Sequence, residues 1–142
     1  MADNSILPVS EFMVKKIVFV KNDETIYETA RKMYENHVGA AVVLENDSLS
    51  GIVTSRDIAI ALTIFEKSPK LEVQNIMSTP VLHVPLEESI IKVAEIMASK
   101  NIHRLAVLDR GEITGIISTS DLAVLFSMSK IGDKKIFGAY LS

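Results

Sequence analysis

Two short stretches of the sequence combine a glycine, a hydroxyl residue and an aspartate at the same spacing. They run from Gly51 to Asp57 (GIVTSRD) and from Gly115 to Asp121 (GIISTSD). Glycine permits close approach by a ligand, and a hydroxyl beside a helix start can bind a phosphate or a sugar. A carboxylate is a good acceptor for the two hydroxyls of a ribose. The pattern therefore suggests a nucleoside ligand whose sugar is held by the aspartate.

The same residues also fit a purely structural role. Thr54-x-x-Asp57 and Ser118-x-x-Asp121 stand directly before apolar, helix-like segments, as the residues of a capping box do. Such a box satisfies the amide groups at the start of a helix without any ligand. The glycine is what this alternative leaves unexplained, because glycine inside a strand lowers stability. Both interpretations stay open: a phosphate corner above the glycine, or a helix cap alone.

Both stretches belong to a duplication that covers most of the chain. A shift of 64 positions aligns residues 12–62 with 76–126 without a gap, and twelve positions are identical. Each copy contains a strand-like run, a helix with an acidic opening, a hairpin and a second helix. This order predicts an α/β (α+β) fold of two tandem β-α-β-β-α repeats. The expected elements are strands at 17–20 and 81–84, helices at 23–36 and 87–100, hairpin turns at 45–48 and 110–112, and second helices at 55–66 and 119–129.

The repeats set the expected domain boundaries. Residues 1–66 form the first repeat with its N-terminal segment, 67–75 a linker and 76–129 the second repeat, while 130–142 form a tail without assignment. The second helices are apolar almost all round, which is typical of helices covered on more than one side. We expect one side to pack within the chain and the other on a second copy, in a homodimer.

Composition excludes several classes of function. The chain has 142 residues, a net charge of −3 and no cysteine, which excludes disulfides, thiolate metal sites and a cysteine nucleophile. The charge argues against nucleic-acid binding. The three histidines have no metal-ligand spacing, and no phosphate loop or serine–histidine–aspartate set occurs. We therefore expect no enzyme, no catalytic residue and no metal site. The longest apolar run is far below the roughly 18 residues that span a bilayer, so we expect no membrane association and a cytoplasmic location.

The doubled unit resembles the CBS domain, named for cystathionine β-synthase, and two in tandem resemble a CBS pair or Bateman module. The G-h-h-[ST]-x-x-D motif recurs in register, and each copy opens with a V-x-x-[FI]-M segment, VSEFM at 9–13 and VQNIM at 73–77. Residues 102–122 are similar to repeats of the gamma subunit of AMP-activated protein kinase. The resemblance covers residues 9–129. It implies two repeats about a pseudo-twofold axis, with two clefts between them.

In this family such clefts commonly bind AMP, ADP, ATP, S-adenosylmethionine or NAD, so the resemblance implies a regulatory adenosine ligand and no required cofactor. It assigns the ribose hydroxyls to Asp57 and Asp121. The two halves differ, so we expect unequal affinities. The other residues that the resemblance implies are Thr54 and Ser118 near the sugar or phosphate, Arg56 and Ser120 as further polar groups, Gly39, Ala40, His103 and Arg104 at the entry to the second strand, and Lys16, Ile17, Thr79, Pro80 and Val81 in the loops entering the first strand.

Together these observations predict a stand-alone regulatory module. An adenine nucleotide or S-adenosylmethionine would bind between the repeats and modulate a partner protein that the sequence does not identify. The alternative is a ligand-independent dimerisation or assembly module, in which the two motifs are helix caps and nothing more.

Overall fold

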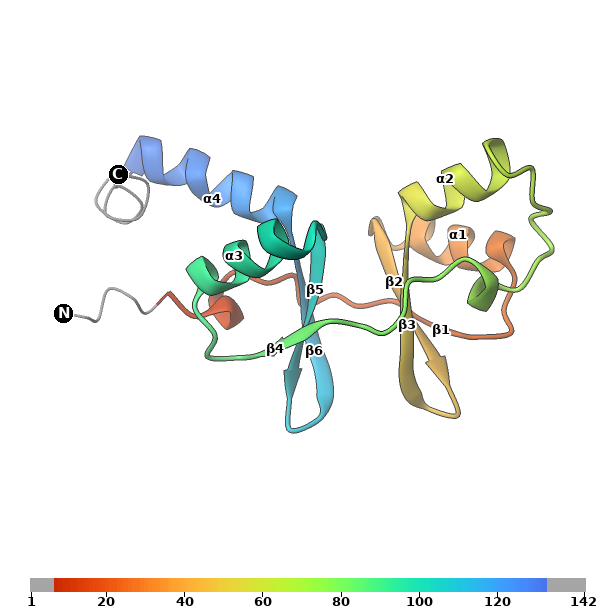
Figure 1. The fold of residues 1–142 in the computed structure, drawn as a ribbon, viewed down its shortest axis with the longest axis horizontal. Helices are drawn as coiled ribbons and strands as arrows, with labels where there is room; N and C mark the ends of the chain where they lie inside the picture. The colour runs from red at the N-terminus through yellow and green to blue at the C-terminus, as the bar shows by residue number, and fades with distance from the viewer. Residues whose placement is uncertain (1–6, 133–142) are drawn as a thin grey trace. The chain divides into compact units, whose positions relative to one another are not determined.

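In the computed structural model, which describes residues 7–132, each repeat folds as a strand, a helix, a two-stranded hairpin and a second helix (Figure 1). This is the predicted β-α-β-β-α order, and the α+β fold class is confirmed. Residues 133–142 of the predicted tail lie outside the described residues. The first repeat contains β1 (Phe19–Lys21), α1 (Ile26–Glu35), β2 (Ala40–Glu45), β3 (Ser48–Thr54) and α2 (Ser55–Thr63), and the second contains β4 (His83–Pro85), α3 (Ile90–Lys100), β5 (Arg104–Asp109), β6 (Glu112–Ser118) and α4 (Thr119–Gly132).

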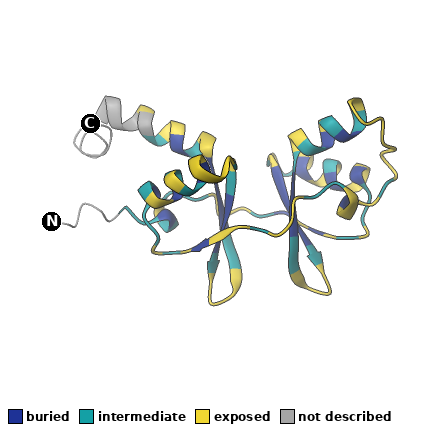
Figure 2. Cartoon of the chain, viewed as in Figure 1, coloured by how far each residue is buried: buried dark blue, intermediate teal, exposed yellow. Residues whose placement is uncertain are grey.

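Each repeat forms its own three-stranded mixed sheet, in the orders β1-β2-β3 and β4-β5-β6. The first strand of each repeat runs parallel to the second, and the hairpin strands are antiparallel. The hairpin turns place Asn46 and Asp47, and equally Arg110 and Gly111, at positive φ. Two consecutive residues at positive φ are typical of the tight turns that match the twist of a hairpin. The turns are exposed while the middles of the strands are buried (Figure 2).

The first helix of each repeat starts a few residues later than predicted, because the acidic pairs at 23–24 and 87–88 precede the capping residue. In α1, the Thr25 hydroxyl accepts the Glu28 amide at 3.0 Å, and the Glu28 carboxylate accepts the Thr25 amide at 2.9 Å. In α3, the Ser89 hydroxyl accepts the Lys92 amide at 3.1 Å. A hydroxyl cap of this kind satisfies an amide that has no partner within the helix.

The chain divides into two compact units that do not follow the order of the repeats. One is residues 16–81, and the other joins residues 1–15 to residues 82–142. Two short 3-10 helices, η2 (Val9–Glu11) and η3 (Val73–Asn75), explain this division. Val9 lies in the core of the second repeat and Val73 in the core of the first, and both are fully buried. Each compact unit thus contains an apolar segment that lies outside its repeat in the sequence, because the core of each repeat needs that segment to close.

The second helices bury one side within the chain. In α2, Ile58 and Ala61 are buried, whereas Ile64 and Phe65, directly after the helix, are 68% and 64% exposed. On α4, Val124 is 59% exposed. Apolar side chains of this region thus remain exposed on the surface of the chain. None of the described helices has the length and apolar character needed to cross a membrane.

Candidate functional site

The Thr54 and Asp57 side chains form a reciprocal cap at the start of α2. The Asp57 amide donates to Thr54 Oγ1 at 3.1 Å, and the Thr54 amide donates to Asp57 Oδ2 at 2.8 Å. This is the capping box that the sequence offered as the structural interpretation of the motif. Both residues are half-buried, so they remain accessible from solvent.

Ser118 and Asp121 form the equivalent cap at the start of α4, with one additional bond. The Asp121 amide donates to Ser118 Oγ at 3.2 Å. The Ser118 amide and hydroxyl both donate to Asp121 Oδ2, at 2.8 and 2.9 Å. Ser118 is buried and Asp121 half-buried. The second cap is therefore more tightly closed than the first.

These caps do not exhaust the two carboxylates. Among the described residues, Asp57 accepts one hydrogen bond and Asp121 accepts two, all at Oδ2. A carboxylate offers about four lone-pair positions, so Oδ1 of each side chain is left for a ligand. Two neighbouring sugar hydroxyls need two acceptor positions. Capping and diol binding are therefore compatible on the same side chain.

In the first repeat, the start of β2 lies beside this cap. Ala40 is opposite Thr54 in the sheet, and the Gly39 carbonyl accepts the Ser55 amide at 3.1 Å. The Arg56 side chain is exposed, one position before the capping aspartate. The structure thus brings together the residues that the sequence proposed around this motif, and it leaves the guanidinium in solvent.

In the second repeat, His103 and Arg104 occupy the same places. Arg104 is opposite Ser118, and the His103 carbonyl accepts the Thr119 amide at 3.0 Å. His103 and Ser120 are exposed. In both repeats the first amide of the second helix is used within the protein. Few helix-start amides are left for an anion, so exposed side chains are the better candidates for contact with a phosphate.

The two proposed loops both belong to the compact unit of residues 16–81. Residues 16–17 come directly before Val18, whose carbonyl accepts the Val42 amide at 2.8 Å, so they reach the end of the sheet where β2 begins. Residues 79–81 follow Ser78, which bridges to β3. The sequence had assigned this second loop to the second copy. In the structure it ends the first unit, and it contains a cis peptide bond between Thr79 and Pro80.

The glycine of each motif is explained by packing within the protein. A Cβ atom placed on Gly51 would lie 2.5 Å from Met77 Sδ and 2.9 Å from the Ser78 carbonyl oxygen. A Cβ atom on Gly115 would lie 2.7 Å from Met13 Cγ and would also meet its sulfur. The space left open above the glycine for a phosphate is filled by a methionine. The glycine therefore gives no separate support to the phosphate corner, and the packing of Met13 and Met77 over the two glycines was not predicted.

The charged residues of the candidate set stand outside ion pairs. Neither Asp57 nor Asp121 pairs with a basic side chain, and neither Arg56 nor Arg104 with an acidic one, within the side chains that the structure describes. Across residues 7–132, no three His, Asp or Glu side chains are grouped to hold a metal ion. The described ion pairs are Arg31–Glu35, Lys32–Glu24 and Lys92–Glu95.

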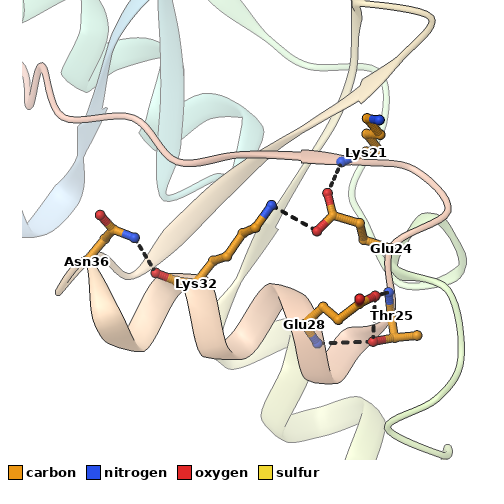
Figure 3. Close-up of polar contacts among 6 residues, drawn as sticks. All are labelled: Lys21, Glu24, Thr25, Glu28, Lys32 and Asn36. Atoms are coloured by element: carbon orange, nitrogen blue, oxygen red, sulfur yellow. Dashed lines mark hydrogen bonds and ion pairs between the residues drawn. The ribbon is translucent and has the colours of Figure 1, made fainter.

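A separate open pocket of about 470 Å³ lies in the first repeat, where β1 and β2 end. It is at the opposite end of β2 from the cap, and the sequence did not predict it. Glu24 lies between the Lys21 amide, at 2.7 Å, and the Lys32 ammonium, at 2.9 Å (Figure 3). Acidic and basic groups are mixed, so the pocket favours no one class of ligand. It is lined by Phe19, Val20, Lys21, Asn22, Asp23, Glu24, Lys32, Leu44, Asn46 and Asp47.

A comparison with models of known protein families matches residues 9–64 and 73–127 to the CBS domain. The CBS domain-containing protein YhcV of Bacillus subtilis is 33% identical over 116 residues, which cover 82% of this chain and 83% of that protein. Other curated relatives are longer, and the chain spans 60% and 40% of two of them.

Solved structures share the fold over most of the chain. The CBS domain pair of protein MJ0100, in complex with 5′-methylthioadenosine and S-adenosyl-L-methionine, has a TM-score of 0.76 at 27% identity. That likeness covers 86% of this chain and 97% of the other. A hexameric CBS-CP12 protein from bloom-forming cyanobacteria has a TM-score of 0.80 at 27% identity, over 88% of this chain and 74% of the other.

Proposed function

Because this chain belongs to the CBS-domain family and carries two of its domains in tandem, we propose that it is a regulatory module that binds an adenosine-containing ligand. Binding changes the balance between conformations of the chain, and a partner protein responds to that change. The size of such a shift is limited by the difference in ligand affinity between the two conformations.

One observation carries the proposal: two equivalent aspartates cap helices and still keep Oδ1 without a described partner. Asp57 and Asp121 are both half-buried at the surface of their repeats. We assign the ribose hydroxyls to these side chains, with the Thr54 hydroxyl as a further donor in the first repeat.

Basic side chains near the caps support a ligand that carries phosphate. Arg56 is exposed beside the first cap, and His103 and Arg104 flank the second. AMP, ADP and ATP fit this charge. S-adenosylmethionine is the other candidate, because it offers the same ribose and is held by the structurally similar MJ0100 pair.

Calorimetric titration of the full chain with AMP, ADP, ATP, NAD and S-adenosylmethionine tests the assignment. We expect one of these ligands to bind with a dissociation constant on the order of micromolar. Asp57→Asn and Asp121→Asn keep a carbonyl oxygen for the cap but replace one acceptor with a donor. Each should weaken binding at its own site by about tenfold or more, which is about 1.4 kcal/mol.

A matched control exists in the cap of α1. Glu28 has the same position in a capping box as Asp57 but belongs to no candidate site. Glu28→Gln should therefore leave ligand affinity unchanged. Undiminished binding by the Asp57→Asn/Asp121→Asn double variant would show that the aspartates are caps alone, and the assignment would be wrong.

A second candidate function, ligand-independent assembly, is favoured by the exposed apolar residues Ile64, Phe65 and Val124. We expect a homodimer in which this surface is covered. Sedimentation of the Ile64→Ser/Phe65→Ser variant should then show a shift from dimer to monomer at about 10 µM. Tyr34→Ser, at the most exposed apolar residue of α1, is the control. A dimer that persists, with no heat from any adenosine ligand, would favour assembly through another surface.

We attribute no reaction to the chain, and its cytoplasmic location also stays a prediction. Steady hydrolysis of ATP by the pure protein, lost in Asp57→Asn, would contradict the view that it is not an enzyme.

A further inference from the structure

Residues 7–15, called the strap from here on, are held on the second repeat by backbone hydrogen bonds at both ends. The Val9 amide donates to the Glu88 carbonyl at 2.7 Å. At the other end, Val14 and Ile116 exchange two hydrogen bonds, of 2.8 and 3.0 Å, in an antiparallel bridge. The strap is thus bound as a peptide is bound along a sheet, through its main chain.

Two side chains anchor the strap between these bonds. Val9 is fully buried in the core of the second repeat. Met13 lies over Gly115, where a Cβ atom would leave no room for it. We call the surface that receives the strap, residues 86–90 and 115–116, the socket. Main-chain bonds supply attachment, and the pockets for a valine and a methionine supply specificity.

The first repeat binds its own segment, residues 71–78, in the same way. The Val73 amide donates to the Glu24 carbonyl at 2.8 Å, and Ser78 and Ile52 exchange bonds of 2.8 and 3.1 Å. These positions are those of the strap contacts shifted by 64 residues. A socket for a V-x-x-[FI]-M segment is therefore a property of each repeat and was used twice by this chain.

The two segments differ in how they are tethered. Residues 71–78 belong to the same continuous stretch as their socket, within 16–81. The strap reaches its socket only through all of residues 16–81, which form the other compact unit. The strap is therefore held on the second repeat by non-covalent contacts, and its only covalent link to that repeat runs through residues 16–81. Lys15 and Lys16, where the chain leaves the strap, are exposed and lie outside helices and strands.

We propose that the socket of the second repeat is an interaction surface for the strap of a second copy of this chain. An exchange of straps between two copies keeps every hydrogen bond and buried side chain of the strap described above, because the sequences are identical. Only the path of the chain after residue 15 changes. The proposal concerns assembly and holds whether or not a nucleotide binds.

Protein concentration decides whether a socket binds the strap of its own chain or the strap of a second copy. The strap of a second copy competes for the socket with the chain's own strap, so exchange increases with protein concentration. Val14 and Ile116 are 102 positions apart, whereas Ser78 and Ile52 are 26 apart. The longer connection restrains the strap less, so the strap should exchange more readily than residues 71–78.

Disulfide trapping in the full chain tests this, because the chain has no cysteine of its own. Paired positions in an antiparallel bridge have Cα atoms about 5.5 Å apart, which suits a disulfide. A Val14→Cys chain is mixed with an Ile116→Cys chain in a glutathione redox buffer, at about 1 mM and about 10 µM. We expect an intermolecular disulfide between positions 14 and 116 that falls at least tenfold on dilution.

Three controls make the result decisive. The Val14→Cys/Ile116→Cys chain should close its own disulfide, and failure to do so would overturn the strap contact itself. Mixed Ser78→Cys and Ile52→Cys chains should give several-fold less intermolecular product. A Pro8→Cys and Ser89→Cys mixture repeats the test at the other end of the strap, where these residues also bridge. Absence of both strap disulfides at the higher concentration would refute the proposal.

Discussion

The hydroxyl of Ser118 donates to Asp121 Oδ2 at 2.9 Å, so this residue both caps α4 and orders the carboxylate that caps it. In the first repeat, the Thr54 hydroxyl accepts the Asp57 amide at 3.1 Å and donates to no described residue. The two motifs are alike in sequence, yet the Thr54 hydroxyl proton is left for a ligand and the Ser118 hydroxyl proton is not. The first repeat therefore has the more open site.

Replacement of the two hydroxyl residues should show this difference. Ser118→Ala removes an amide acceptor and a donor to a half-buried carboxylate, so we expect a loss of about 2 kcal/mol in unfolding free energy. Thr54→Ala removes the acceptor alone and should cost about 1 kcal/mol. Urea unfolding near neutral pH measures both. A larger loss for Thr54→Ala would contradict the bond pattern at Ser118.

The glycines should respond unequally to a methyl group. At Gly51 an added Cβ meets the Ser78 carbonyl at 2.9 Å as well as Met77, and a backbone atom cannot easily move aside. At Gly115 the close atoms belong to the Met13 side chain, which can change rotamer. We expect Gly51→Ala to cost about 2–3 kcal/mol and Gly115→Ala less, by urea unfolding.

Removal of the methionine side chain separates a clash with that side chain from a clash with the backbone carbonyl of Ser78. Met13→Ala should remove most of the additional cost of Gly115→Ala, because the three atoms nearest to the added Cβ all belong to the Met13 side chain. Met77→Ala should not remove most of the cost of Gly51→Ala, because the Ser78 carbonyl oxygen stays 2.9 Å from the added Cβ. Equal rescue in both repeats would mean that the Ser78 carbonyl plays no part.

The repeat made most of the fold predictable from the sequence. Helical periodicity and the two acidic openings placed α1 and α3 to within a few residues, and the apolar runs placed the hairpins. The assignment of residues 7–15 and 71–78 was out of reach. The two V-x-x-[FI]-M segments are visible in the sequence, but nothing in them shows that Val9 is buried in the second repeat and Val73 in the first.

The candidate site was predictable in its members but not in its chemistry. Thr54 and Asp57 were found, with their capping bonds, from spacing alone. The glycine was misinterpreted as room for a ligand, because a sequence does not show that Met77 reaches back over Gly51. Met77 is 26 positions from Gly51 and Met13 is 102 positions from Gly115, so no local sequence pattern indicates these contacts. Only the packing of distant segments supplies them.

Acid should weaken the chain in part through Glu28. Hydrogen bonds from the backbone and the side chain of Thr25 hold the pKa of Glu28 below its ordinary value. A lowered pKa in the folded state means that the unfolded state binds more protons. The contribution to stability is therefore present above the unfolded pKa and is lost as the pH falls through the folded one.

Glu28→Gln keeps an acceptor for the cap but cannot titrate. Its unfolding free energy should fall less steeply than that of the parent chain between about pH 5 and about pH 3. Glu95→Gln is the control, since among the described residues this carboxylate meets only the Lys92 ammonium, at 4.0 Å. The same pH dependence in Glu28→Gln and the parent would contradict the role of Thr25.

The first repeat should become more stable if one hydroxyl is removed from its core. Thr29 on α1 is fully buried, and its Oγ1 has no hydrogen-bond partner among the described residues. The equivalent residue of the second repeat is Val93, which is also fully buried. A buried polar atom without a partner costs about 1–3 kcal/mol, whereas valine has nearly the same shape and no such cost.

Thr29→Val should therefore raise the unfolding free energy by about 1 kcal/mol or more, as measured by urea unfolding. The reverse change, Val93→Thr, places the same hydroxyl in the equivalent core and should lower it by a similar amount. The two substitutions together should nearly cancel, because they lie in different compact units. A loss of stability in Thr29→Val would mean that the hydroxyl has a partner, such as a buried water.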